Sequence, residues 1–242
     1  MDKKTIVVVG AGQGLGNHVA RRFGKAGFRV VLMARNGESL KHYQQEFTAD
    51  GIETYVHEAD AERPEALADA FARVKERLGT PDILVYNVGI TAADEPDKMT
   101  SAELMRHYQA DVASAWHCAR LVVDEEFEKK RGAIIFTGGG LATHPLASFT
   151  PLSVDKAALR ALAYLLHDEL KPKGIYVGTV TVCGTISIDA YFAPARMAET
   201  YWQMYNERGV CEVRYEYPEL QGCSLSAQEY WAKAYELAEK YK

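Results

Sequence analysis

A glycine-rich segment near the start of the chain has the spacing needed to bind phosphate. It runs Gly10-Ala-Gly-Gln-Gly-Leu-Gly16, after the apolar residues 5–9 and before an amphipathic stretch, which predicts a strand, a tight turn and a helix. Backbone without side chains can approach a pyrophosphate closely, and the helix points unpaired N–H groups and its positive dipole end at it. The alternative is a turn that binds nothing. The residues predicted to bind a dinucleotide are Gly10, Gly12, Gln13, Gly14, Leu15 and Gly16.

The end of the second apolar run bears on the choice between the two nicotinamide dinucleotides. The run Arg29-Val-Val-Leu-Met33 is followed by Ala34-Arg35-Asn36, which contains no carboxylate. An acidic residue here would bind a ribose 2′-hydroxyl, whereas a basic residue neutralises a 2′-phosphate. Arg35 therefore favours NADP(H) over NAD(H), the alternative being a solvated arginine at a strand end.

Alternating strand and helix patterns would position these residues. Predicted strands lie at residues 5–9, 29–33, 52–58, 82–86, 133–137, 175–182 and 210–217, and helical patterns lie near 37–50, 65–78, 101–129 and 157–166. Strands separated by helices imply right-handed parallel crossovers. We therefore expect an α/β fold: a single Rossmann-like doubly wound parallel sheet of about seven strands, with helices on both faces and ligands at the carboxyl ends of the strands.

The chain is expected to form one NADP(H)-binding Rossmann-like domain over residues 1–242, because no repeat or proline-rich linker divides it. Within it we predict a substrate-lid-like segment at 187–209 and a C-terminal helical tail at 224–242. In the first of these, four large side chains recur at helical spacing, which indicates core packing, a subunit contact or a lid over an apolar substrate. They are Met197, Tyr201, Met204 and Tyr205.

Composition and charge exclude several classes of function. A net charge of -5 argues against general nucleic-acid or membrane-surface binding. The four cysteines lack the spacing of a zinc site or a disulfide framework, so no metal is expected. The start is too short for a signal sequence, and no run approaches the roughly 20 apolar residues of a membrane span. We expect a cytoplasmic protein that acts on a small molecule and has no nucleic-acid or membrane partner.

Together these residues resemble the short-chain dehydrogenase/reductase family over about residues 4–186. The glycine segment matches the family's Thr-Gly-x-x-x-Gly-x-Gly turn, with Val9 in place of the threonine. The resemblance implies that Asp60 contacts adenine and that Asn87 and Gly89 belong to the family's Asn-Asn-Ala-Gly segment. Plainer roles remain open, since Asp60 could cap the following helix and Asn87 and Gly89 could form an ordinary turn.

The resemblance also implies four catalytic positions. In the family a tyrosine exchanges a proton with the substrate oxygen during hydride transfer, and a lysine four residues later holds the nicotinamide ribose. A serine orients the substrate oxygen, and an asparagine anchors a relay water. Here the lysine is Lys156, and the other three positions hold Leu152, Gly139 and Asp111. Because leucine transfers no proton, and losing a positioned acid or base removes about 10²- to 10⁴-fold of rate, we expect ordinary carbonyl reduction to be slow or absent.

Other groups could take over the proton transfer. His144 follows the fifth predicted strand, and histidine suits proton exchange near neutral pH. Asp111 could act as a base. Ser148, Ser153 and Tyr191 are further candidates, and each could equally be an ordinary loop or helix residue. Lys156 could hold the nicotinamide ribose without a tyrosine, or be a solvated lysine.

Two functions from different classes therefore remain open. The first is an NADP(H)-dependent oxidoreductase of unknown substrate with a degraded catalytic tetrad, which the family resemblance supports. The second is an NADP(H)-binding sensor or partner subunit without turnover, which Leu152 and Gly139 support. Members of the family commonly assemble through the long helices after the fourth and fifth strands, so we expect a homodimer or homotetramer.

Overall fold

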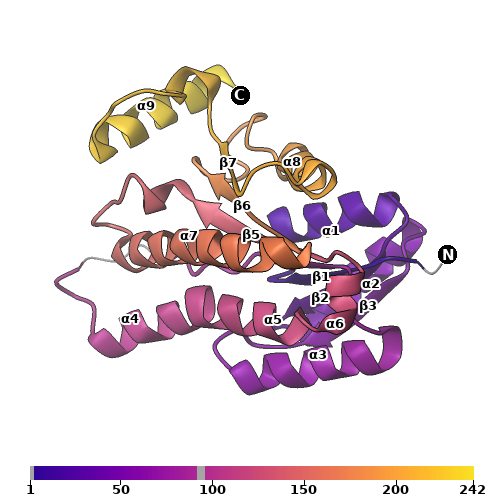
Figure 1. Ribbon diagram of the computed structural model, residues 1–242. Helices are drawn as coiled ribbons and strands as arrows, with labels where there is room; N and C mark the ends of the chain where they lie inside the picture. The colour runs from indigo at the N-terminus through magenta and orange to yellow at the C-terminus, as the bar shows by residue number, and fades with distance from the viewer. Residues whose placement is uncertain (1–2, 92–95) are drawn as a thin grey trace.

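Seven parallel strands form one sheet in the computed structural model, which describes residues 3–91 and 96–242 (Figure 1). The order across the sheet is β3-β2-β1-β4-β5-β6-β7. This confirms the doubly wound Rossmann-like sheet expected from the sequence. The strands are β1 (Thr5–Val9), β2 (Arg29–Ala34), β3 (Thr54–Glu58), β4 (Ile83–Tyr86), β5 (Ala133–Gly139), β6 (Tyr176–Val182) and β7 (Glu212–Tyr215).

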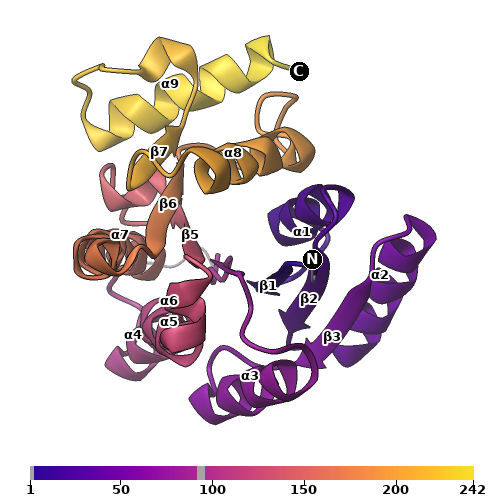
Figure 2. The same ribbon diagram turned by 45° about the vertical axis from the view of Figure 1, so that its right-hand side comes forward.

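Helices cover both faces of this sheet (Figures 1 and 2). One core is built with α1 (Leu15–Lys25), α2 (Gly37–Ala49), α8 (Pro194–Glu207) and α9 (Ala227–Lys240). The opposite core is built with α3 (Pro64–Leu78), α5 (Ser114–Val122), α6 (Glu125–Lys129) and α7 (Thr150–Leu170). A further helix, α4 (Ser101–Tyr108), leads into α5.

The central strands read as continuous apolar runs because they are buried on both faces. In β1, Ile6 and Val8 belong to the core on the α1 side, whereas Val7 and Val9 belong to the core on the α3 side. The chain builds the sheet outward in one direction from β1 to β3 and in the other from β4 to β7. The reversal leaves a crevice at the carboxyl ends of β1 and β4, where open α/β sheets bind ligands.

The region predicted as one helical stretch at 101–129 is interrupted twice. A π-helical turn, Gln109–Ala113, joins α4 to α5. The chain then turns extended at Val123, and the Asp124 carboxylate caps α6 by accepting a hydrogen bond from the Phe127 N–H at 2.8 Å. Aspartate satisfies such orphan donors well, which explains why a new helix begins there.

Two segments near the C-terminal end were predicted to lie outside the central sheet, a lid-like segment and a helical tail. The four large side chains of α8 are buried in the core, where the helix packs against α1, so core packing accounts for their spacing. The lid-like role of 187–209 stays a prediction. The C-terminal tail forms α9, with a capping box between Ser226 and Glu229. Within the described ranges, no helix is long and apolar enough to cross a lipid bilayer.

Candidate cofactor-binding and active site

Two adjoining cavities form a groove over the carboxyl ends of the central strands. The smaller, of about 460 Å³, lies by the ends of β1, β2 and β3. The larger, of about 580 Å³, lies between β5, α7 and α9. Both are lined by Asn87–Gly89 and by Thr91, so one extended ligand can reach across them. This position matches the crevice in which doubly wound sheets hold dinucleotides.

The glycine turn is shaped for close approach of a ligand to backbone. Gly10 has a φ of +87°, and a Cβ added there would lie 2.5 Å from the Asn87 carbonyl oxygen. At Gly12 and Gly14, by contrast, an added Cβ would meet no atom within 4 Å. The first turn of α1 receives no side-chain cap. The Asn17 N–H donates to the Gly12 carbonyl at 3.3 Å, and the N–H groups of Leu15 and Gly16 before it are available to an anion, as a pyrophosphate site requires.

The smaller cavity combines two arginines with two carboxylates. Arg35 is largely exposed and its guanidinium lies 3.9 Å from the Glu62 carboxylate, which also pairs with Arg106 at 3.4 Å. Asp60 accepts a hydrogen bond from the Glu62 N–H at 3.1 Å and lines the cavity. The cap position of α3 belongs to Arg63, so Asp60 is not a helix cap. Sequence reasoning missed Arg106 and Glu62, which come from a helix and a loop far apart in the chain.

Asn87 connects the glycine turn to the neighbouring strand ends. Its amide nitrogen donates to the Gly10 carbonyl at 3.0 Å, and its amide oxygen accepts from the Thr137 hydroxyl at 2.8 Å. The Thr137 oxygen lies 2.7 Å from the Tyr201 hydroxyl. Since a hydroxyl has one proton and that of Thr137 goes to Asn87, Tyr201 must be the donor in this last contact. Asn87 is thus part of a hydrogen-bonded chain and more than a turn former.

Lys156 lies buried in the larger cavity with its ammonium turned toward backbone. The Nζ donates to the Thr137 carbonyl at 2.9 Å and to the Val88 carbonyl at 3.2 Å. A Cβ added at Gly139 would lie 3.1 Å from the Lys156 Cγ, so the small residue makes room for the lysine stem. Burial lowers the pKa of Lys156, and the nearby Asp111 and Asp155 carboxylates oppose that shift.

Two buried carboxylates lie close to this lysine. Asp111, in the π-helical turn, is fully buried and accepts the Ile90 N–H with both oxygens at 3.1 Å. Its pKa is raised by burial, against the attraction of Lys156. Asp155 is also fully buried, and neither of its oxygens has a hydrogen-bond partner among the described residues. Burial, followed by repulsion from Asp111, raises the pKa of Asp155 to about 7.

Leu152 lies one helical turn before Lys156 on α7 and is buried in the wall of the same cavity. No tyrosine hydroxyl of the described residues is hydrogen-bonded to the Lys156 ammonium. One tyrosine does line this cavity, Tyr235, which comes from α9 together with Trp231. The sequence predicted this helix but carried no local signal that it would reach the groove.

Comparison with known proteins settles the family. The model of the short chain dehydrogenases matches residues 4–190. The chain is a member of the short-chain dehydrogenase family. The 7alpha-hydroxysteroid dehydrogenase of Escherichia coli (strain K12) is 30% identical over 191 residues, which cover 78% of this chain and 74% of that protein. Oxidoreductase UcpA of the same strain is 28% identical over 180 residues, covering 73% of this chain and 67% of that protein.

Solved structures of short-chain dehydrogenases share the fold. A metagenomic short-chain oxidoreductase in complex with NADP is 25% identical, with a TM-score of 0.78 over 87% of this chain and 96% of that one. The L-sorbose reductase from Gluconobacter frateurii, complexed with NADPH and L-sorbose, is 22% identical, with a TM-score of 0.81 over 89% and 95% of the two chains. The second similarity supports the fold alone.

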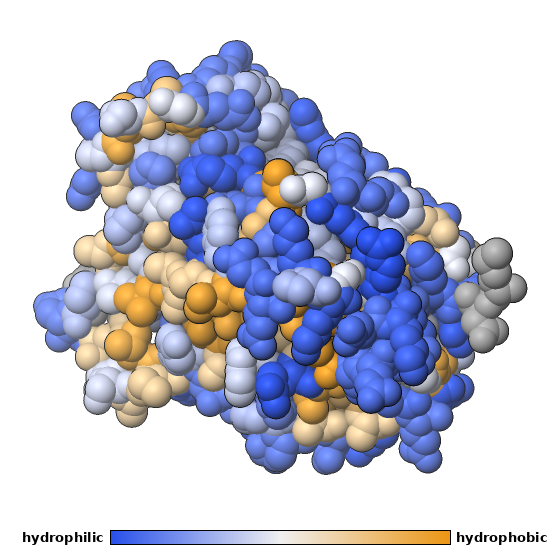
Figure 3. Space-filling model, in the orientation of Figure 1, coloured by the Kyte–Doolittle hydropathy of each residue, from blue (hydrophilic) through white to orange (hydrophobic). Residues whose placement is uncertain are grey.

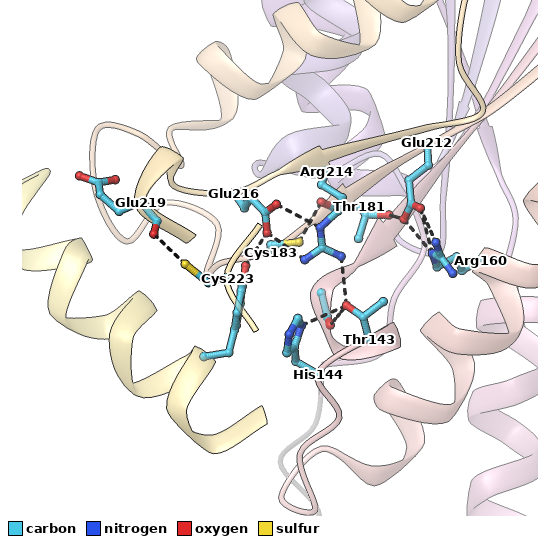
Figure 4. A network of polar contacts seen from close by, with 12 residues as sticks. Thr143, His144, Arg160, Thr181, Cys183, Glu212, Arg214, Glu216, Glu219 and Cys223 are labelled. Carbon is cyan, nitrogen blue, oxygen red and sulfur yellow. Dashed lines mark hydrogen bonds and ion pairs between the residues drawn. The ribbon is translucent and has the colours of Figure 1, made fainter. Parts of the chain in front are cut away.

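The short-chain dehydrogenase match ends before α8, so β7 and α9 lie beyond it. His144 shows how this later part is attached (Figure 4). Its ring stacks on Tyr230 of α9 with centroids 4.0 Å apart, and its backbone carbonyl accepts the Trp231 indole N–H at 2.8 Å. Burial, followed by the Arg214 charge, lowers the pKa of His144. The structure thus places this imidazole in the contact between α9 and the loop before α7.

The remaining candidate proton donors of this short-chain dehydrogenase also lie outside the described lining of the larger cavity. The Ser153 hydroxyl is 3.3 to 3.4 Å from the backbone of Leu146, and Ser148 is exposed. The Tyr191 hydroxyl donates to the Glu216 carbonyl at 2.8 Å. Of the side chains predicted to take part in catalysis, Lys156 lines the larger cavity, and Asp111 lies near that lysine, fully buried and outside the described lining of both cavities.

Proposed function

We propose that this protein binds NADP(H) along the groove and is an oxidoreductase whose proton-transfer step is weak. The observation that carries the proposal is the arrangement on α7. Lys156 reaches the centre of the groove, while the residue one turn earlier in the same wall is Leu152. By family comparison, that position would supply the phenol that exchanges a proton with the substrate oxygen.

The residues present fit the cofactor. The glycine turn and the uncapped start of α1 suit the pyrophosphate, because Gly12 and Gly14 leave open space where a side chain would intrude. Asp60 lines the end suited to adenine, and Arg35 is free enough to neutralise a 2′-phosphate. The NADP held by the metagenomic short-chain oxidoreductase supports the choice of NADP(H).

Lys156 is the residue we assign to the nicotinamide ribose. An ammonium has three N–H groups, and two of them donate to the carbonyls of Val88 and Thr137. One is left for a ribose hydroxyl. When bound, the cofactor supplies or accepts the hydride. The chain must then provide or remove a proton at the substrate oxygen, and Leu152 can do neither.

The same observation favours a second function, an NADP(H)-binding sensor or partner subunit without turnover. A leucine packed in the wall, with Gly139 opposite the lysine stem, leaves the reacting end of the groove without a hydroxyl at either family position. The two functions differ in one measurement. An oxidoreductase consumes NADPH with at least one carbonyl compound, and a sensor binds NADPH without consuming it.

Restoring the phenol tests the mechanism. We expect Leu152→Tyr to raise NADPH-dependent reduction of a carbonyl panel by about 10²-fold or more over the parent chain. Leu152→Phe is the matched control, because it adds the same ring without the hydroxyl. Gly139→Ser is added in a second step, since its Cβ presses on the Lys156 stem. Equal rates for the tyrosine and phenylalanine variants, with and without Gly139→Ser, would show that the missing phenol does not limit the reaction.

We also propose that the chain forms a homodimer or homotetramer through α4 and α7. Apolar side chains gather on the surface between these helices (Figure 3). Exposed large apolar residues on α4 and α7 include Met105, Val154 and Leu165, the last of these 68% exposed. Clustered exposed apolar residues of this kind are typical of a protein interface.

A further inference from the structure

The outer end of the larger cavity is walled by apolar side chains. Leu141 and Phe149 come from the segment between β5 and α7, Leu152 from α7, and Ile186 from the loop after β6. Trp231 and Tyr235 of α9 complete the wall. Among the described lining residues, Lys156 alone carries a charge, and two of its N–H groups are already used by backbone carbonyls.

The start of α9, which carries Trp231, is held in place, and Tyr235 one turn later is 53% exposed. The Trp231 indole donates to the His144 carbonyl, and the neighbouring Tyr230 donates to the Glu216 carboxylate at 2.9 Å. Glu216 is in turn paired with Arg214, which reaches the Thr143 hydroxyl beside His144 (Figure 4). The loop before α7 and the start of α9 are therefore joined by two sets of contacts, one direct and one through Arg214 and Glu216.

The polar side chains at the inner end of the cavity, Asn87, Thr137 and Lys156, are engaged in hydrogen bonds. The hydroxyls of Thr91, Thr185, Ser187 and Tyr235 also line the cavity. The Thr137 hydroxyl is used by Asn87 and Tyr201. A polyhydroxylated or charged substrate would lose more hydration here than these few hydroxyls and the one charged residue, Lys156, can replace. An apolar ring, by contrast, would gain from burial and from stacking on the indole and phenol faces.

We infer that the substrate is a neutral, largely apolar, ring-bearing carbonyl or alcohol, and that Tyr235 and Trp231 determine this specificity. The inference rests on the proposed function, because it assumes that the inner part of the groove holds NADP(H). It concerns binding and does not require rapid turnover. Tyr235 acts through its ring face and contributes no proton.

Binding to the NADPH-loaded protein tests the inference. 2-Acetylnaphthalene is titrated into the complex by calorimetry, with L-sorbose as the polyhydroxylated comparison. We expect 2-acetylnaphthalene to bind at least about tenfold more tightly than L-sorbose. Tyr235→Ala should weaken its binding by about 3- to 10-fold, the range for loss of one aromatic contact, and Tyr235→Phe should leave it unchanged.

Tyr164→Ala is the matched control, because Tyr164 is a partly exposed tyrosine that does not line the cavity. Its binding of 2-acetylnaphthalene should equal that of the parent chain. The inference is wrong if NADPH binds but 2-acetylnaphthalene binds no better than L-sorbose, or if Tyr235→Ala and Tyr164→Ala behave alike. If NADPH itself does not bind, the proposed function fails, and this inference fails with it.

Discussion

Replacing Asp155 by asparagine should stabilise the protein in a way that depends on pH. The carboxylate is fully buried and has no hydrogen-bond partner among the described residues, and its pKa is raised to about 7 from an ordinary 3.8. Between these values the unfolded chain has lost the proton that the folded chain still holds. Stability contributed by this group is therefore complete below pH 4 and is lost as the pH rises to about 7.

The size of the effect follows from the interval between the two pKa values. Each pH unit within it lowers the free energy of unfolding by about 1.4 kcal/mol. The total decrease is about 4 kcal/mol above pH 8, and about 1.6 kcal/mol of it has already occurred at pH 5. Solvent screening reduces the contribution of any charge that is not fully desolvated, so this total is an upper bound. We therefore expect the stability difference between Asp155→Asn and the parent to grow by about 1 to 3 kcal/mol from pH 5 to pH 8.

Urea unfolding at pH 5, 6, 7 and 8 measures this difference. Any effect of the asparagine amide itself is constant with pH and cancels in the comparison between pH values. Asp168→Asn is the control, because Asp168 is an exposed carboxylate on the same helix. If the stability difference between Asp155→Asn and the parent stays constant with pH, or decreases toward pH 8, the argument that the buried Asp155 carboxyl is protonated is wrong.

Three further results are expected. Gly10→Ala should destabilise the fold by about 1–3 kcal/mol, because the added Cβ would lie 2.5 Å from the Asn87 carbonyl oxygen at a φ of +87°. Thermal or urea unfolding measures this, and an unchanged midpoint would contradict it. NADPH should raise the melting temperature more than NADH does, and Arg35→Ala should abolish this difference. Equal increases with NADPH and NADH in the parent chain would show that Arg35 does not select the 2′-phosphate. Leu165→Glu should lower the mass measured by light scattering, and an unchanged oligomer would place the interface elsewhere.

Much of the fold could be predicted because its signals are local. The apolar run at 5–9 and the glycine turn after it gave β1 and the start of α1 at the expected residues. Arg35, Asp60 and Asn87 follow strand ends, and parallel strands bring all such ends to one edge of the sheet. Their common groove follows from topology alone.

The rest could not be predicted because it depends on contacts between distant segments. His144 has the chemistry of a proton donor, but its ring is used by Tyr230, which lies 86 positions later in the printed sequence. Asp155 precedes the lysine by one residue and would be solvated on many helices. Its burial depends on how α7 packs against the π-helical turn that carries Asp111.

A series of hydrogen bonds connects Tyr201 of α8, through Thr137 and Asn87, to Gly10 in the glycine turn. Each member donates to the next, so removing the first donor loosens the whole series. Under the proposed NADP(H) binding, a substitution at Tyr201 in the core would therefore also change how firmly the glycine turn holds a pyrophosphate.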